Sequence, residues 1–102
     1  MLIFTNTYHR PNLEVQWHDN VIDSTAYLPF FMSYHENGKI LHKYVSEGTD
    51  GLSKTWTIIF DSKESYQEYI ADVNLKPMWG LKNQYNNENG IVRDEPVLED
   101  IT

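Results

Sequence analysis

The stretch from residue 37 to residue 70 limits the possible folds more than any other part of this chain. It reads NGKILHKYVSEGTDGLSKTWTIIFDSKESYQEYI. Two runs rich in β-forming residues, 39–47 and 53–60, flank a short glycine-containing turn, and this arrangement predicts a β-hairpin. A helix is expected next, because apolar side chains recur at helical spacing in Tyr66, Tyr69, Ile70 and Val73. Strand, strand and helix in this order make half of a ferredoxin-like α+β unit.

The helix after the hairpin has a start signal and two alternative continuations. Asp61 and Glu64 have the spacing of a capping box, so Asp61 is the expected N-cap. Pro77 either ends or kinks this helix, or stands in the first turn of a second helix over residues 77–87. The apolar positions of that second segment are Met78, Trp79, Leu81 and Tyr85.

The first part of the chain can supply a further strand. Residues 2–8 alternate and are rich in β-formers, which predicts a first strand. A turn follows at Pro11. Residues 13–17 form either a short half-exposed strand or an extended loop, and residues 18–24 are expected to be a loop.

Residues 25–37 have two interpretations. A short helix is favoured, because Pro29 suits a first helical turn and because Tyr27, Phe30, Phe31 and Tyr34 lie at helical spacing. The alternative is a strand that turns at Asn37-Gly38, a dipeptide typical of hairpins.

The end of the chain offers a last strand. Ile91 and Val92 start it, Val97 and Leu98 extend it, and residues 99–102 are expected to fray. Residues 1–102 are therefore predicted to form a single α+β domain, a ferredoxin-like antiparallel sheet with helices packed on one face.

Both faces of this predicted sheet carry apolar side chains. In the strand at 53–60, Trp56, Ile58 and Phe60 share one face, whereas Ile59 shares the other with two threonines. Helices cover only one face of a two-layer domain, so the other face needs a partner. The pattern favours a homodimer. The alternative is that the threonine side faces water.

Charge and composition exclude several classes of partner. The net charge is −7, with eight basic residues scattered among fifteen acidic ones, so no nucleic acid and no anionic membrane surface is expected to bind. Without cysteine, disulfides and thiolate metal sites are excluded. No signal peptide or membrane-length apolar run is visible, which predicts a cytoplasmic protein. The Asn-rich, Lys-over-Arg composition is typical of an AT-rich bacterial or phage genome, so we expect the cell to be a bacterium or a virus-infected host.

Motifs for metal binding and nucleophilic catalysis are missing. The histidines do not stand at the spacings that metal sites use, and no serine has the context of an activated nucleophile; the four histidines are His9, His18, His35 and His42. We therefore expect no metal and no cofactor. His42 is the one candidate catalytic base, because it lies in mid-strand beside aromatic residues; an ordinary sheet histidine is the alternative.

One group of residues can form a small-molecule site. If the strand faces align, five side chains lie together on one side of the sheet: Asn6, Tyr8, His42, Tyr44 and Trp56. An apolar concavity with a few polar groups is the usual form of a ligand pocket, so these are candidate ligand-binding residues. The alternative is an ordinary aromatic core with a hydrogen-bonded Asn6.

The segments GKILHKYVSE and SKTWTIIFDSKESYQEYIAD, followed by a second helical piece and NGI, resemble the dimeric α/β-barrel superfamily, which includes antibiotic-biosynthesis-monooxygenase-like proteins. The resemblance covers residues 38–92, with residues 2–8 as the first strand. It implies paired ferredoxin-like sheets that close into a barrel, with any site between sheet and helices.

Haem-degrading members of that superfamily use an Asn in the first strand, a Trp in the second helix and a following His. Asn6 matches the first, and Tyr69 stands at the Trp position, which adds Tyr69 to the candidate ligand-binding residues. No His occurs around Trp79, so the resemblance does not extend to haem.

Three functions remain open at this point. The favoured one is a homodimeric module that binds a small apolar ligand or a protein partner. The second is a cofactor-independent monooxygenase or isomerase of aromatic substrates, with His42 as the base and Asn6 and Tyr44 orienting the substrate. The third is a phage or bacterial structural or assembly protein that docks through a sheet edge or the Trp17 loop.

Overall fold

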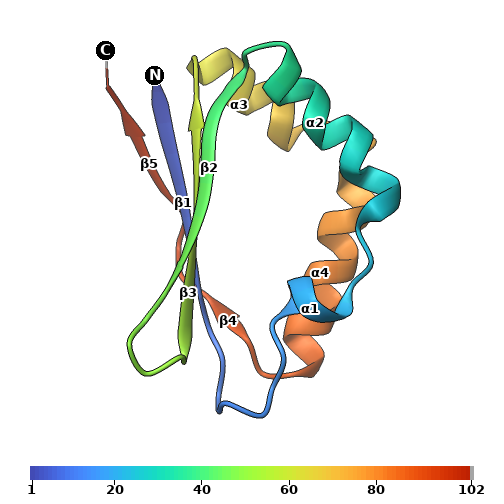
Figure 1. The fold of residues 1–102 in the computed structure, drawn as a ribbon, viewed down its shortest axis with the longest axis vertical. Coiled ribbons are helices and arrows are strands. Elements are labelled where there is room, and N and C mark those ends of the chain that lie inside the picture. The colour runs from blue at the N-terminus through green and yellow to red at the C-terminus, as the bar shows by residue number, and fades with distance from the viewer. Residues whose placement is uncertain (102) are drawn as a thin grey trace.

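The computed structural model describes residues 1–101, and residue 102 lies outside the described part. A five-stranded antiparallel sheet forms one layer, and the helices form a second layer on one face of it (Figure 1). The strands are β1 (Leu2–His9), β2 (Ile40–Glu47), β3 (Ser53–Phe60), β4 (Val92–Arg93) and β5 (Val97–Asp100). The helices are α1 (His18–Val21), the 3₁₀ turn η1 (Thr25–Tyr27), α2 (Leu28–Glu36), α3 (Lys63–Ile70) and α4 (Lys76–Glu88). The predicted ferredoxin-like α+β fold is confirmed.

The strand order is β2-β3-β1, with β4 and β5 both paired to the free edge of β1. β1 and β3 pair along their whole length, from Leu2 opposite Phe60 to His9 opposite Ser53. The last strand is in two pieces around Pro96, which has no N–H to give to the ladder. The expected fraying from residue 99 is wrong for Glu99 and Asp100, because both pair with β1 in β5.

Residues 25–37 contain a helix, and the hairpin alternative is wrong. Pro29 stands in the first turn of α2, where its missing N–H leaves no helical hydrogen bond unmade. Gly38 follows the helix with a φ of 73°, a left-handed conformation that turns the chain into β2. Tyr34 is buried and Phe31 packs against the core, whereas Phe30 is exposed.

Residues 18–24 are not simply a loop, because His18–Val21 form the single helical turn α1. Trp17 anchors this turn: its side chain is 2% exposed, and the Arg10 guanidinium lies 4.7 Å from its ring centroid. The Tyr85 hydroxyl donates to the Gln16 carbonyl oxygen at 2.6 Å and ties the segment to α4. The burial of Trp17 also contradicts a docking role for that loop.

The N-cap of α3 is Ser62 rather than Asp61. Ser62 Oγ accepts a hydrogen bond from the Ser65 N–H at 3.2 Å, whereas the Asp61 N–H donates to the Lys39 carbonyl at the sheet end. Asp61 therefore still belongs to the strand connection, one residue before the cap. Of the two continuations, the second helix is observed, since α4 begins with Pro77 in its first turn.

The core fills one end of the space between the two layers. Phe60 and Leu75 are fully buried there. Tyr69 meets four other rings edge-on or tilted: Tyr34, Phe60 and Trp79 at centroid distances of 5.3–5.4 Å, and Phe31 at 6.2 Å. The Tyr34 hydroxyl donates to Asp72 Oδ2 at 2.7 Å, which fixes α2 against the end of α3. None of the helices among residues 1–101 is long and apolar enough to cross a membrane.

A β-bulge at Leu41 changes which β2 side chains face the helices. Ile40 pairs with Phe60, but His42 pairs with the next residue of β3, Ile59, so Leu41 has no partner of its own. The bulge places Lys43 on the helix side with Ile40, and it places His42 and Tyr44 on the opposite face. The predicted alignment of His42 and Tyr44 with Asn6 is therefore wrong.

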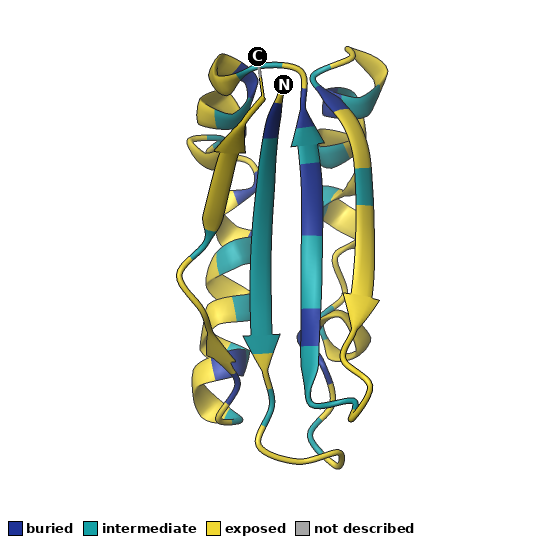
Figure 2. Ribbon diagram, turned by 90° about the vertical axis from the view of Figure 1, so that its left-hand side faces the viewer, coloured by how far each residue is buried: buried dark blue, intermediate teal, exposed yellow. Residues whose placement is uncertain are grey.

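Figure 2 looks onto the open face of the sheet, where no helix lies in front of the strands. The strand registers place two rows across it: Val97, Thr5, Thr57 and Tyr44 in one, and Glu99, Ile3, Ile59 and His42 in the other. On the same face, the hydroxyl groups of Thr7 and Thr55 form a hydrogen bond, with 3.0 Å between their Oγ1 atoms. No helix of the described residues covers this surface.

Candidate functional site

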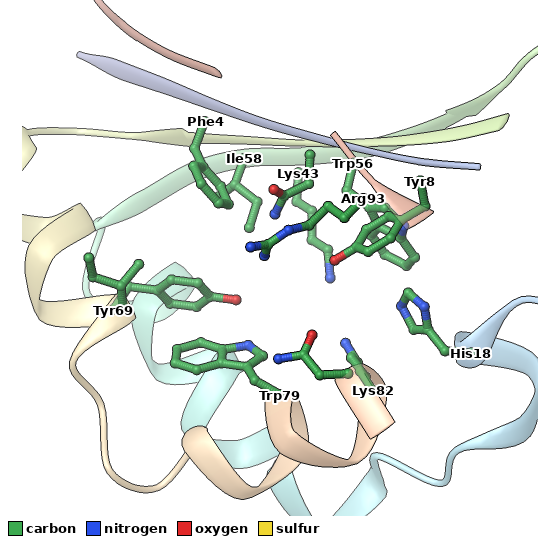
Figure 3. A pocket seen from close by; sticks show the side chains of 13 residues that line it. Phe4, Tyr8, His18, Lys43, Trp56, Ile58, Tyr69, Trp79, Lys82 and Arg93 are labelled. Carbon is green, nitrogen blue, oxygen red and sulfur yellow. The ribbon is translucent and has the colours of Figure 1, made fainter. Parts of the chain in front are cut away.

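A cavity of about 270 Å³ lies between the sheet and the helices, beyond the end that the core fills. Its walls come from both layers, as Figure 3 shows: side chains of β1, β2, β3 and β4 lie on one side, and side chains of α1, α3 and α4 on the other. The lining includes aromatic, amide and basic side chains, among them Phe4, Asn6, Tyr8, Trp56, Tyr69, Trp79, Lys43, Lys82, Arg93 and His18.

The sheet wall follows from strand alternation. Phe4, Asn6 and Tyr8 are every second residue of β1 and point to the helix side. Asn6 lies opposite Trp56 of β3, so these two meet across the centre of the wall. Arg93 of β4 lies opposite Tyr8 and closes the edge of the sheet.

The helix wall is built from residues at helical spacing. Trp79 and Lys82 are three residues apart on α4 and reach the cavity together. Tyr69 of α3 supports Trp79 with ring centroids 5.3 Å apart. At the far end His18 stacks on Trp56, with an interplanar angle of 21° and a centroid distance of 6.0 Å.

Three ammonium groups surround the indole of Trp56. The Nζ atoms lie 5.0, 5.3 and 5.9 Å from its ring, and they belong to Lys43, Lys54 and Lys82. Cations within about 6 Å of a ring face are attracted by its negative quadrupole. Lys54 also forms an ion pair with Asp19 at 2.8 Å, whereas among residues 1–101 neither Lys43 nor Lys82 has a carboxylate within 4.0 Å.

Burial lowers the pKa of several basic groups of the cavity. It lowers the pKa of Lys43 to about 8, and the nearby Lys82 ammonium adds to this shift while Asp19 opposes it. Burial likewise lowers the pKa of Lys82. It lowers the pKa of His18 to about 4, with Lys82 again contributing, so the His18 imidazole is neutral at pH 7. With a pKa of about 8, Lys43 still carries most of its charge at pH 7.

The tyrosine hydroxyls of the cavity remain neutral. Burial raises the pKa of Tyr69, and burial also raises the pKa of Tyr8, although the Arg93 guanidinium partly offsets the second shift. Three polar atoms of lining residues are buried without a hydrogen-bond partner among the described residues: Asn6 Oδ1, His18 Nδ1 and Trp56 Nε1. Besides its charges, the lining thus contains an acceptor, a donor and an imidazole nitrogen that no group of the described residues satisfies.

Of the six residues proposed from the sequence, the structure brings four together. Asn6, Tyr8, Trp56 and Tyr69 line the cavity. His42 and Tyr44 lie on the open face, where their rings contact each other with centroids 5.4 Å apart. His42 therefore does not reach Asn6 within one subunit, and it is not a base for this cavity.

Sequence reasoning missed the basic residues and His18. Lys54 carried a usable signal, since it alternates in phase with Trp56, Ile58 and Phe60 and so had to lie on the apolar face. Lys43 had no such signal, because the bulge at Leu41 sets its direction. Lys82 and His18 come from separate segments that only the packing of α4 and α1 brings to the sheet. No group of three or more metal-binding side chains occurs among residues 1–101.

No protein-family model matches the sequence, and no curated protein matches it. Solved structures do match the fold. A candidate antibiotic biosynthesis monooxygenase from Deinococcus radiodurans has a TM-score of 0.67 at 12% identity, over 100% of this chain and 93% of that one.

Two further structures fit about as well. SnoaB, a cofactor-independent oxygenase from Streptomyces nogalater, has a TM-score of 0.65 at 8% identity, over 99% of this chain and 92% of SnoaB. A dimeric ferredoxin-like protein from an uncultured marine organism has a TM-score of 0.65 at 12% identity, over 99% and 96% of the two chains. The chain therefore has the ferredoxin-like fold of the antibiotic-biosynthesis-monooxygenase-like proteins, as the sequence resemblance predicts.

Proposed function

We propose that this protein is a homodimer that binds a planar aromatic small molecule in the cavity of each subunit. The observation that carries the proposal is the cavity, whose volume of about 270 Å³ lies just below the ~300–1,000 Å³ typical of ligand pockets. Aromatic rings line it from both layers: Phe4, Tyr8, Trp56, Tyr69 and Trp79. Such rings favour a flat ligand that stacks on them or meets them edge-on.

The unpartnered polar atoms support the same proposal. A buried polar group without a hydrogen bond costs about 1–3 kcal/mol. A ligand with a hydroxyl and an acceptor oxygen supplies a partner for Asn6 Oδ1 and for Trp56 Nε1, and so recovers part of that cost. This favours a phenol or enol over a plain hydrocarbon.

The open face of the sheet supports the homodimer. A second copy of the chain covers the apolar side chains in the two rows that contain Thr5 and Ile3. A stable interface buries about 800 Å² of surface on each partner. The fold is shared with a dimeric ferredoxin-like protein, which favours the same arrangement here.

A cofactor-independent oxygenase is the second candidate function, and the similarity to SnoaB favours it. With His42 on the other face, Lys43 is the candidate base, because a pKa of about 8 leaves roughly a tenth of its amine neutral at pH 7. For a naphthol probe the neutral amine takes the phenolic proton, and the phenolate gives electrons to O₂. A C–O bond forms, the C–H and O–O bonds break, and water leaves: 1-naphthol plus O₂ gives 1,4-naphthoquinone plus H₂O.

Titration calorimetry with 1-naphthol, under nitrogen and in chelator-treated buffer, tests binding. We expect saturable binding by the wild-type protein, weaker binding by Phe4→Leu, and wild-type binding by Phe30→Leu, which makes the same change at an exposed site on α2. If wild-type protein binds no naphthol, the proposal fails. Oxygen uptake and quinone formation in air then separate the two functions, since a binding module consumes no O₂.

A further inference from the structure

We infer that the ligand of this cavity carries a negatively charged oxygen group on its ring, and that the Lys43 and Lys82 ammonium groups hold that group. This inference rests on the proposed function and names the class of ligand more closely. It follows from the distribution of charge in the chain.

The cavity is positive although the protein is acidic. The chain has eight basic and fifteen acidic residues, yet the lining contains three basic side chains and no carboxylate. The basic ones are Lys43, Lys82 and Arg93, and Figure 3 shows the ends of all three directed into the space between the sheet and the helices. The net charge of the whole chain is negative, so the positive charge of this lining is opposite to the average of the protein.

The nearby carboxylate does not neutralise this charge. Asp19 is the acid nearest to the lysines, and it is paired with Lys54 at 2.8 Å. Asp72, which follows α3, accepts a hydrogen bond from the Tyr34 hydroxyl. The ammonium of Lys43 lies 4.2 Å from the Phe31 ring and 5.0 Å from the Trp56 ring, and these contacts attract the cation without cancelling its charge.

Two like charges held in a half-buried apolar site raise the free energy of the folded protein. The lowered pKa of Lys43, caused by burial and by Lys82, is the consequence expected of that repulsion. An anionic oxygen placed between the two ammonium groups relieves it. A smaller hollow of about 120 Å³ shares Lys43, Lys82, Trp56 and Tyr69 with the main cavity, and Asp19, which is paired with Lys54, also lines it. The oxyanion sits at this junction beside the Lys43 and Lys82 ammonium groups, and the ring extends into the aromatic part.

The test compares two probes of nearly equal shape, 2-naphthoate and its neutral amide 2-naphthamide, by titration calorimetry at pH 7. A hydrogen bond to a charged group contributes about 1.5–3 kcal/mol. We therefore expect 2-naphthoate to bind at least about tenfold more tightly than 2-naphthamide. Lys43→Met and Lys82→Met should each reduce naphthoate affinity about tenfold and leave naphthamide affinity nearly unchanged. Lys76→Met, on the same helix as Lys82 but exposed, should bind both probes as the wild type does.

The outcomes separate this inference from the proposed function. If naphthamide binds as tightly as naphthoate, the cavity takes aromatic ligands but has no anion preference, and the inference is wrong. If neither probe binds, the proposed function fails with it. If the lysines serve only to stack on aromatic side chains, both variants lower the stability but leave the naphthoate-to-naphthamide affinity ratio at its wild-type value.

A third probe distinguishes the source of the oxyanion. 2-Naphthol is neutral at pH 7, so the naphthol must release a proton if it binds as the phenolate. The buffer takes up this proton, and the measured heat of binding then varies with the ionisation heat of the buffer. A phenolate ligand predicts this release. If naphthoate binds and naphthol binding releases no proton, the ligand is a carboxylate. Either result agrees with an anion site. The anion site is contradicted if naphthol binds as the neutral phenol and naphthoate and naphthamide bind with equal affinity.

The naphthoate affinity should also depend on pH. Loss of the Lys43 proton above pH 8 should weaken naphthoate binding in the wild type, and this step should be missing in Lys43→Met. The other titratable and charged groups that face Lys43 from the surrounding elements are Lys82, Asp19, Lys54, His18, His35, Tyr8, Tyr69 and Arg93. An identical pH profile in wild type and variant assigns the step to one of these groups and contradicts the role of Lys43.

Discussion

Lys54 Nζ lies 2.8 Å from Asp19 Oδ2, and this ion pair joins the beginning of β3 to the single turn of α1. The Lys54 side chain is 9% exposed, so its charge is almost completely removed from water. Because α1 carries His18 to the end of the cavity, the pair also positions that wall.

Asp19→Asn should destabilise the protein by on the order of 2–3 kcal/mol, because it leaves the Lys54 charge buried without a counter-charge. The value lies below that of a fully buried pair, since the Asp19 side chain is 28% exposed. Urea unfolding measures it. The double variant Lys54→Met with Asp19→Asn should be more stable than Asp19→Asn alone; equal stabilities would show that the unpaired charge is not the cause.

The His18→Phe variant should gain stability relative to the wild type as the pH falls. The pKa of His18 is about 4 in the folded protein and near 6.5 when unfolded, so between these values the unfolded state binds the proton. The wild type therefore loses stability as the pH falls from about 6.5 toward 4, by up to roughly 3 kcal/mol at 1.36 kcal/mol per unit. Phe keeps the ring and has no proton to bind.

Thermal or urea unfolding of both proteins from pH 7.5 to pH 4.5 measures this difference. Subtracting one stability curve from the other removes the contribution of the carboxylates, which titrate in the same pH range and are present in both proteins. A stability difference that stays constant over this pH range would contradict a neutral His18.

Thr5→Lys should convert the proposed homodimer into a monomer. Thr5 lies in the middle of the open face, between Val97 and Thr57, so a second copy must bury the new charge, which is costly. Thr49→Lys makes the same change at the exposed hairpin tip and should leave the dimer intact. Sedimentation velocity distinguishes the two masses, and a monomeric wild-type protein at micromolar concentration would exclude the homodimer.

Gly38→Ala and Gly80→Ala should change stability in opposite directions. Both added methyl groups enter open space, so no clash contributes. Gly38 has a φ of 73°, and Ala there should cost about 1–2 kcal/mol. Gly80 lies inside α4, where Ala should stabilise by about 0.5–1 kcal/mol. Urea unfolding checks both signs, and equal signs would contradict the backbone assignment of Gly38.

Local patterns predicted most of the secondary structure. The hairpin of β2 and β3 follows from two β-rich runs around a turn, and α2 follows from Pro29 in its first turn and Gly38 after its end. The N-cap of α3 was displaced by one residue, because Asp61 and Ser62 are both good caps and the strand connection to Lys39 already uses Asp61. Such choices depend on contacts outside the segment.

The candidate site was only half predictable. Alternation in β1 and β3 gave Asn6, Tyr8 and Trp56, because neither strand is interrupted. It failed for His42 and Tyr44, because one extra residue in β2 reverses the direction of every side chain that follows it.

The sequence alone determined the ferredoxin-like α+β fold, the acidic charge and the apolar character of both sheet faces, since these depend on composition and on the period of neighbouring residues. Only the tertiary structure decided the strand order, the bulge and the positive cavity. Lys43, Lys82 and Arg93 come from β2, α4 and β4, and nothing in their local sequence records that the packing of helices on the sheet brings them together.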